Sequence, residues 1–122
     1  MDFEKAINAH ADWKNKLSKY LDNPDQSLQS AEIALENKCE LGKWIEGDGK
    51  QFAGKPEFAT MKSHHANFHK IAAKIVHRAN SGEKVSHELT LGGKSEFVSA
   101  STAVVRAIMA LRAKIEKPVA AK

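Results

Sequence analysis

The chain contains a single cysteine, three prolines and seven glycines among 122 residues. One cysteine excludes an internal disulfide and, in a reducing compartment, leaves the thiol for packing, metal binding or redox chemistry. The sequence also lacks any run of the roughly 20 apolar residues that a membrane-spanning helix needs. Its N-terminus lacks the apolar core and cleavage site of an export signal. We therefore expect a cytoplasmic protein with no membrane partner.

Excess charge of one sign is absent except near the C-terminus. Residues 1–103 contain 14 Lys and Arg and 14 Asp and Glu, so the net charge of +4 arises entirely within residues 104–122. No aromatic residues interleave with those cations, as a surface that stacks nucleic-acid bases would require, and we expect no nucleic-acid partner. A chain of this length, 42% hydrophobic, forms one core and not two. The sequence thus predicts a single domain over residues 1–122.

Four stretches repeat apolar residues at helical spacing, and turn-forming clusters separate them. The first covers about residues 2–21, the second begins at Ser27 or Ser30 and ends at Ile45, and the others cover about 56–80 and 95–117. The glycine-rich segment 47–56 is predicted to be a loop, and no stretch is typical of a strand. The pattern favours an all-α fold, an antiparallel four-helix bundle.

The last of these stretches has a wide apolar stripe. Val98, Val105 and Met109 lie beside its main row, which indicates contact with more than its own bundle. We expect a partner surface here, and a homodimer through helix faces. The main row consists of Phe97, Ser101, Val104, Ile108, Leu111 and Ile115.

The third stretch carries two histidines four residues apart, His65 and His69. Side chains at this spacing lie one above the other on a helix, with Cβ atoms about 5–6 Å apart, so both imidazoles can bind one ion. Alone, such a pair also arises by chance in a chain with six histidines. The pair therefore becomes informative only together with further ligands.

Two further polar groups interrupt apolar rows: His10 in the first stretch and Cys39 in the second, beside Leu35. Each buried neutral histidine needs hydrogen-bond partners that apolar rows do not supply. Three imidazoles and a thiolate form a tetrahedral set suited to Zn²⁺, whereas Mg²⁺ and Ca²⁺ prefer oxygen. We therefore predict a zinc site in the bundle interior. Its ligands are His10, Cys39, His65 and His69.

The remaining histidines and the large aromatic residues receive other roles. His77 follows the histidine pair at a spacing that drifts off its helix face, and His87 falls in a polar connection where we expect it to be exposed. The aromatic residues are predicted to pack in the core and to exclude water from the metal. They are Trp13, Trp44 and Phe68.

Three short motifs resemble those of the chemoreceptor zinc-binding domain family, often called the CZB domain. They are residues 10–14 (HADWK), 39–45 (CELGKWI) and 65–69 (HANFH), which occur in the family's order and at similar separations. The resemblance covers most of the chain, from about Phe3 to Ala110. It implies the same four zinc ligands and a cytoplasmic, regulatory four-helix bundle that is commonly dimeric. It also implies attachment to a chemoreceptor or a diguanylate cyclase, in cis or in trans.

Enzyme classes fit the sequence less well. A di-metal bundle requires Glu-x-x-His pairs on two helices, and none occurs. A metalloprotease requires His-Glu-x-x-His, but residue 66 is alanine. Four protein ligands would also leave zinc no open position for water. We therefore predict no enzyme, and a zinc-binding regulatory or sensor domain in which occupancy or oxidation of the site alters helix packing and partner output. The alternative is a purely structural, zinc-stapled dimerisation module.

Overall fold

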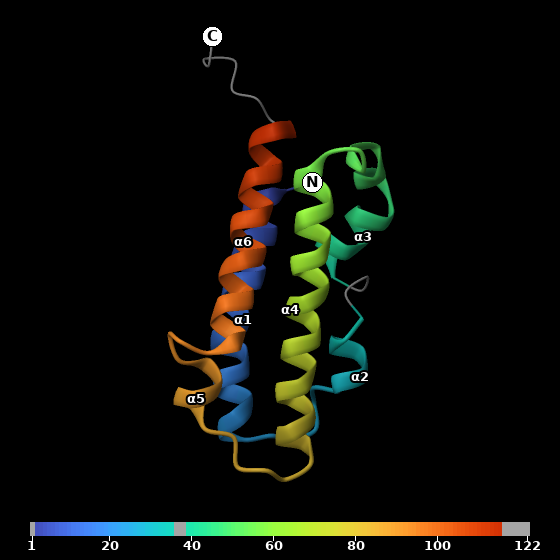
Figure 1. Ribbon diagram of the computed structural model, residues 1–122. Helices are drawn as coiled ribbons and strands as arrows, with labels where there is room; N and C mark the ends of the chain where they lie inside the picture. The colour runs from blue at the N-terminus through green and yellow to red at the C-terminus, as the bar shows by residue number, and fades with distance from the viewer. Residues whose placement is uncertain (1, 36–38, 116–122) are drawn as a thin grey trace.

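The computed structural model describes residues 2–35 and 39–115, and every regular element within them is helical. Three long helices run side by side: α1 (Phe3–Asp22), α4 (Pro56–Asn80) and α6 (Glu96–Ile115) (Figure 1). The prediction of an all-α fold is confirmed for these residues. Every end of a long helix that was predicted within the described residues lies within two residues of its predicted position. The predicted end of the last helix, residue 117, lies outside the described residues.

Helix α4 is the centre of the core. It packs against α6 along one side and against α2 (Ser30–Ile33) on another, while α1 packs across α6. Met61, Phe68 and Val76 of α4 are completely buried. The helix begins with Pro56, whose missing N–H and fixed φ suit a first helical turn.

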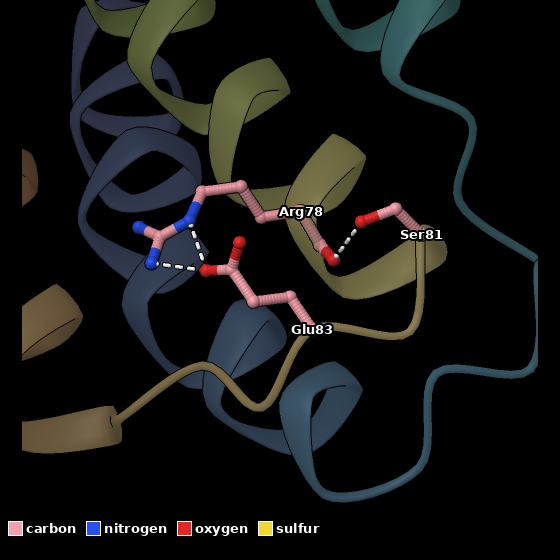
Figure 2. Close-up of polar contacts among 3 residues, drawn as sticks. All are labelled: Arg78, Ser81 and Glu83. Carbon is pink, nitrogen blue, oxygen red and sulfur yellow. Dashed lines mark hydrogen bonds and ion pairs between the residues drawn. The ribbon is translucent and has the colours of Figure 1, made fainter.

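Polar contacts mark the other end of α4 (Figure 2). The Ser81 hydroxyl donates a hydrogen bond to the Arg78 carbonyl at 2.8 Å, which satisfies a carbonyl of the last turn. The Arg78 guanidinium donates to the Glu83 carboxylate through Nε at 2.6 Å. Gly82 then adopts φ of 89°, a left-handed conformation that glycine reaches without strain. The helix therefore ends at the predicted Asn-Ser-Gly turn.

The predicted continuous helix from Ser27 or Ser30 to Ile45 is wrong. Two short helices, α2 and α3 (Glu40–Glu46), occupy this part of the chain, and residues 36–38 lie outside the described residues. Neither serine caps α2, because Gln29 holds that position. The helical periodicity continues across the interruption, so apolar spacing alone does not reveal it.

The break changes the position of two residues that the sequence placed on one buried helix face. Leu35 is 44% exposed. The backbone of Cys39 is extended, with ψ of 164°, and its sulfur accepts a hydrogen bond from the Gly42 N–H at 3.4 Å. Cys39 is therefore the N-cap of α3, because a side-chain acceptor there satisfies an otherwise unpaired N–H of the first turn.

Two predicted connections contain short helices. A 3-10 helix, η2 (Asp48–Phe52), lies in the glycine-rich loop, and α5 (His87–Leu91) precedes α6. The expectation that His87 is exposed is wrong, since its ring is half-buried. Its Nδ1 lies 3.2 Å from the Ser18 hydroxyl and its Nε2 lies 3.2 Å from the Asp22 carboxylate. This contact explains the burial, because α5 folds back onto α1.

No helix in the described part of the chain is both long enough and apolar enough to cross a membrane.

Candidate metal centre

The structure brings the four predicted ligands together from three elements. His65 and His69 lie one turn apart on α4, His10 lies on α1, and Cys39 is the N-cap of α3. One nitrogen from each imidazole and the sulfur all lie within 4.8 Å of one another. The three imidazoles are buried, with exposed fractions of 3%, 0% and 4% for His10, His65 and His69. Residues distant in sequence thus converge on one small volume of the core.

Two backbone carbonyls orient the imidazoles of His10 and His69. His10 Nδ1 lies 2.8 Å from the Ala6 carbonyl oxygen, one turn earlier on α1. His69 Nδ1 lies 2.8 Å from the Ile33 carbonyl oxygen at the end of α2. A carbonyl can only accept, so each Nδ1 carries a hydrogen, and in the neutral ring Nε2 then presents a lone pair. This tautomer is the one that metal-bound histidines held by a carbonyl adopt.

The distances among three of the four groups, His65, His69 and Cys39, are close to those of a tetrahedral ligand set, and the four donor atoms all lie within 4.8 Å of one another. His65 Nε2 lies 3.1 Å from His69 Nε2, and the Cys39 sulfur lies 3.2 Å and 3.6 Å from these two atoms. Ligands of tetrahedral zinc at bond lengths of about 2.0–2.1 Å to nitrogen and 2.3 Å to sulfur are separated by about 3.3 Å for two nitrogens and 3.6 Å for nitrogen and sulfur. The side chains are therefore arranged closely enough to bind one ion.

Some buried nitrogens of the site lack a protein partner. Within the described residues, His10 Nε2 and His65 Nδ1 make no hydrogen bond although both are inaccessible to solvent. An unsatisfied buried polar atom costs about 1–3 kcal/mol of folding free energy. Because His10 Nε2 is the lone-pair nitrogen, a cation among the four groups would satisfy it. The unpaired atom is thus independent evidence for a ligand at this place.

The electrostatics keep the histidines ready to bind a cation. Burial lowers the pKa of His10 below its ordinary value. Burial, together with repulsion from His69 and His10, lowers the pKa of His65 to about 3. Both rings are therefore neutral near pH 7, which is the protonation state that coordinates a metal.

Aromatic shielding comes chiefly from Phe68. Its ring is completely buried and lies 5.3 Å from the His10 ring and 5.7 Å from the His69 ring, centroid to centroid. Trp44 instead packs edge-on against Phe3. Trp13 is partly exposed, with the Lys16 ammonium 4.6 Å from its ring. The prediction that aromatic side chains cover the site therefore holds for Phe68, whereas the tryptophans pack elsewhere in the described contacts.

Sequence reasoning missed the two carbonyl partners. The Ala6 and Ile33 oxygens orient His10 and His69, but a backbone carbonyl leaves no residue-type signal. The helical i, i−4 spacing of Ala6 and His10 could have suggested the first contact. Nothing local could have suggested the second, because Ile33 precedes an interruption that periodicity did not detect. The two histidines that the sequence excluded lie apart, since His77 is exposed and His87 contacts α1.

Fold and site together define a helical domain with a buried cluster of three nitrogens and one sulfur suited to zinc. The sequence model of the chemoreceptor zinc-binding (CZB) domain matches residues 10–76, which is more than half of the chain and begins at His10. The chain belongs to this zinc-binding family, and the four clustered side chains are its candidate zinc ligands. Searches of curated proteins and of solved structures returned no match.

The lowered histidine pKa values predict a stability that falls with acid. A group whose pKa is depressed on folding binds more protons when unfolded, so acidification from about pH 6.5 towards the folded value of about 3 favours unfolding. Each such histidine contributes at most about 1.4 kcal/mol per pH unit. In chelator-treated protein, the free energy of unfolding in urea should be lower at about pH 5.5 than at about pH 7.5. The drop should be smaller in His65→Leu; equal stability at both pH values would contradict the assignment.

Proposed function

We propose that this protein is a zinc-binding regulatory domain in which one Zn²⁺ joins α1, α3 and α4 within a four-helix bundle whose second member is interrupted. The observation that carries the proposal is the convergence of three buried imidazoles and one sulfur. His10, His65 and His69 would each supply Nε2, and Cys39 would supply its sulfur. The family match supports zinc as the ion, and the donor set disfavours Mg²⁺ and Ca²⁺, which prefer oxygen.

Binding rather than catalysis follows from the ligand count. His10, Cys39, His65 and His69 would fill the four positions of tetrahedral zinc, so no position would remain for an activated water. The four clustered donors are three imidazoles and one sulfur. No carboxylate belongs to this cluster of described residues, so the cluster itself offers no carboxylate as a general base. We therefore infer a binding module and not a hydrolase.

Regulation is suggested by where the sulfur lies. The histidines are on the long helices α1 and α4, whereas Cys39 is at the start of the short helix α3. Among the four clustered donors of the described residues, only Cys39 comes from this part of the chain, so its bond to the metal would hold α3 against α4. Loss of zinc, or two-electron oxidation of the thiolate to sulfenic acid, would remove that bond. A change in α2–α3 packing is the output that we propose.

The outer face of α6 is the proposed surface for a second copy of the chain. Val98 and Val105 are partly buried and Met109 is 55% exposed. They line a groove of about 380 Å³ together with Ala11 of α1. A small domain gains apolar burial by association through such a face. We propose that the homodimer presents its signal to a further protein, either a chemoreceptor, in keeping with the family name, or a diguanylate cyclase, in cis or in trans.

A structural zinc staple is the second candidate, and the closed ligand set favours it. The two functions differ in whether the metal leaves under cellular conditions. A saturated, buried set is typical of structural zinc, whereas partial exposure of Cys39 favours exchange. Competition with chelators of graded affinity separates them, because only a regulatory site exchanges metal at free zinc concentrations that a cell reaches.

Metal analysis tests the ligand set. Purified protein should contain one zinc per chain, and each of His10→Ala, Cys39→Ala, His65→Ala and His69→Ala should weaken zinc binding by more than about a hundredfold, since ligand loss exceeds the 10–100-fold effect of outer contacts. His77→Ala removes an exposed histidine of the same helix and should bind zinc normally. Zinc at a thousandfold excess over its dissociation constant should stabilise the fold by about 4 kcal/mol. Wild-type zinc affinity in Cys39→Ala would refute the site.

Sedimentation of zinc-loaded protein tests the dimer. We expect dimers at tens of micromolar, and Met109→Glu should weaken association by about tenfold or more, because it places a charge in an apolar interface. Ala59→Glu introduces the same charge at an exposed position on α4 and should leave association unchanged. A wild-type protein that is monomeric throughout would remove the dimer proposal while leaving the zinc site intact.

A further inference from the structure

A surface cavity reaches the site from between α1 and α3. Its volume is about 220 Å³, and its lining includes two candidate zinc ligands, His10 and Cys39. The inner lining is apolar, with the buried Ala6 and Leu41, whereas the exposed Ala9 and the charged residues lie at the outside. The charged lining residues are Asp2, Lys5 and Glu40.

Burial differs sharply around this cavity. His10 is 3% exposed, and its Nε2 has no partner among the described residues. Cys39 is partly exposed, and Ala9 and Glu40 are exposed. His65 and Phe68, which form the inner side of the site, are completely inaccessible. Among the candidate ligands, the partly exposed Cys39 is therefore the one that a molecule in solvent reaches most easily, and the cavity leads to it.

We propose that this cavity, which we term the access cavity, is the route by which small solutes reach the Cys39 sulfur, and that its rim selects them by size and charge. The inference rests on the zinc-binding function proposed above and specifies how that site communicates with solvent. Ala9 sets the width of the opening, because it is the exposed small residue of α1 that lines it.

The charges of the rim favour neutral solutes over anions. Among the described residues of the outer rim, Asp2 and Glu40 are acidic and Lys5 is basic, so these three side chains carry a net charge of −1. Glu40 is adjacent to Cys39 in sequence and begins α3. Near a protein surface, one unit charge at contact range changes the local concentration of a small ion by a few fold. An uncharged oxidant or alkylating agent should therefore reach the sulfur more readily than an anionic one of similar size.

Alkylation measures access directly, because Cys39 is the only cysteine in the chain. Iodoacetamide is neutral and iodoacetate is an anion of nearly the same shape. In each reaction the sulfur forms a carbon–sulfur bond and iodide leaves with the bonding electron pair, and any thiol proton passes to solvent. Mass spectrometry of the intact zinc-loaded protein over time gives both rates, and zinc content is measured in the same samples.

Ala9→Leu should slow both alkylations by about fivefold to tenfold, because a solute must displace the leucyl side chain from its preferred rotamer. The substitution keeps a strong helix former in α1. Ala59→Leu makes the same change at an exposed α4 position outside the cavity and should react like wild type. Equal rates in all three proteins would overturn the route.

Glu40→Gln tests the charge of the rim separately. It should raise the rate with iodoacetate relative to iodoacetamide by about twofold to fourfold. Glu46→Gln, at the other end of the same helix, should leave the ratio unchanged. An unchanged ratio in Glu40→Gln would refute charge selection. Absence of zinc from the wild-type protein would instead refute the proposed function. The alkylation rates of the metal-free wild type, Ala9→Leu and Ala59→Leu would then still show whether the access cavity is the route to the sulfur.

Discussion

Everything around the site depends on placing three imidazoles and one sulfur in an otherwise apolar core. Burying such groups without partners is costly. Carbonyl oxygens satisfy one nitrogen of His10 and one of His69, and the remaining lone pairs converge with the Cys39 sulfur. A cation at the centre would satisfy these lone pairs, so we expect metal binding to stabilise the folded domain.

The position of the Cys39 sulfur accounts for the two short helices, α2 and α3, that stand where the sequence predicts one long helix. A continuous helix there would make Cys39 one interior residue among many. As the N-cap of α3, it directs its sulfur to His65 and His69 at 3.2 and 3.6 Å. The His69–Ile33 hydrogen bond links the end of α2 to the same histidine pair. The site thus links both short helices to the histidines of α4, and in the proposed function a change at the sulfur would act on this segment first.

Most of the architecture could be predicted from the sequence because α1, α4 and α6 are long and periodic. The α4 row from Phe58 to Ala79 is buried as its spacing indicates. The interruption before Cys39 could not be predicted, since apolar spacing is the same on both sides of it. The clustering of the four candidate ligands could be predicted, because polar groups interrupting apolar rows need a common partner. Their carbonyl contacts and the position of His87 depend on tertiary structure that no local pattern encodes.

The first coordination shell of the metal tests the central claim most directly. X-ray absorption at the zinc edge of the purified protein should give three nitrogen ligands at about 2.0–2.1 Å and one sulfur at about 2.3 Å, with no further oxygen ligand. In Cys39→Ala the sulfur contribution should vanish, while in His77→Ala the spectrum should be unchanged. A shell without sulfur in the wild-type protein, or one with two or more sulfurs contributed by separate chains, would contradict a site built within one chain from His10, Cys39, His65 and His69.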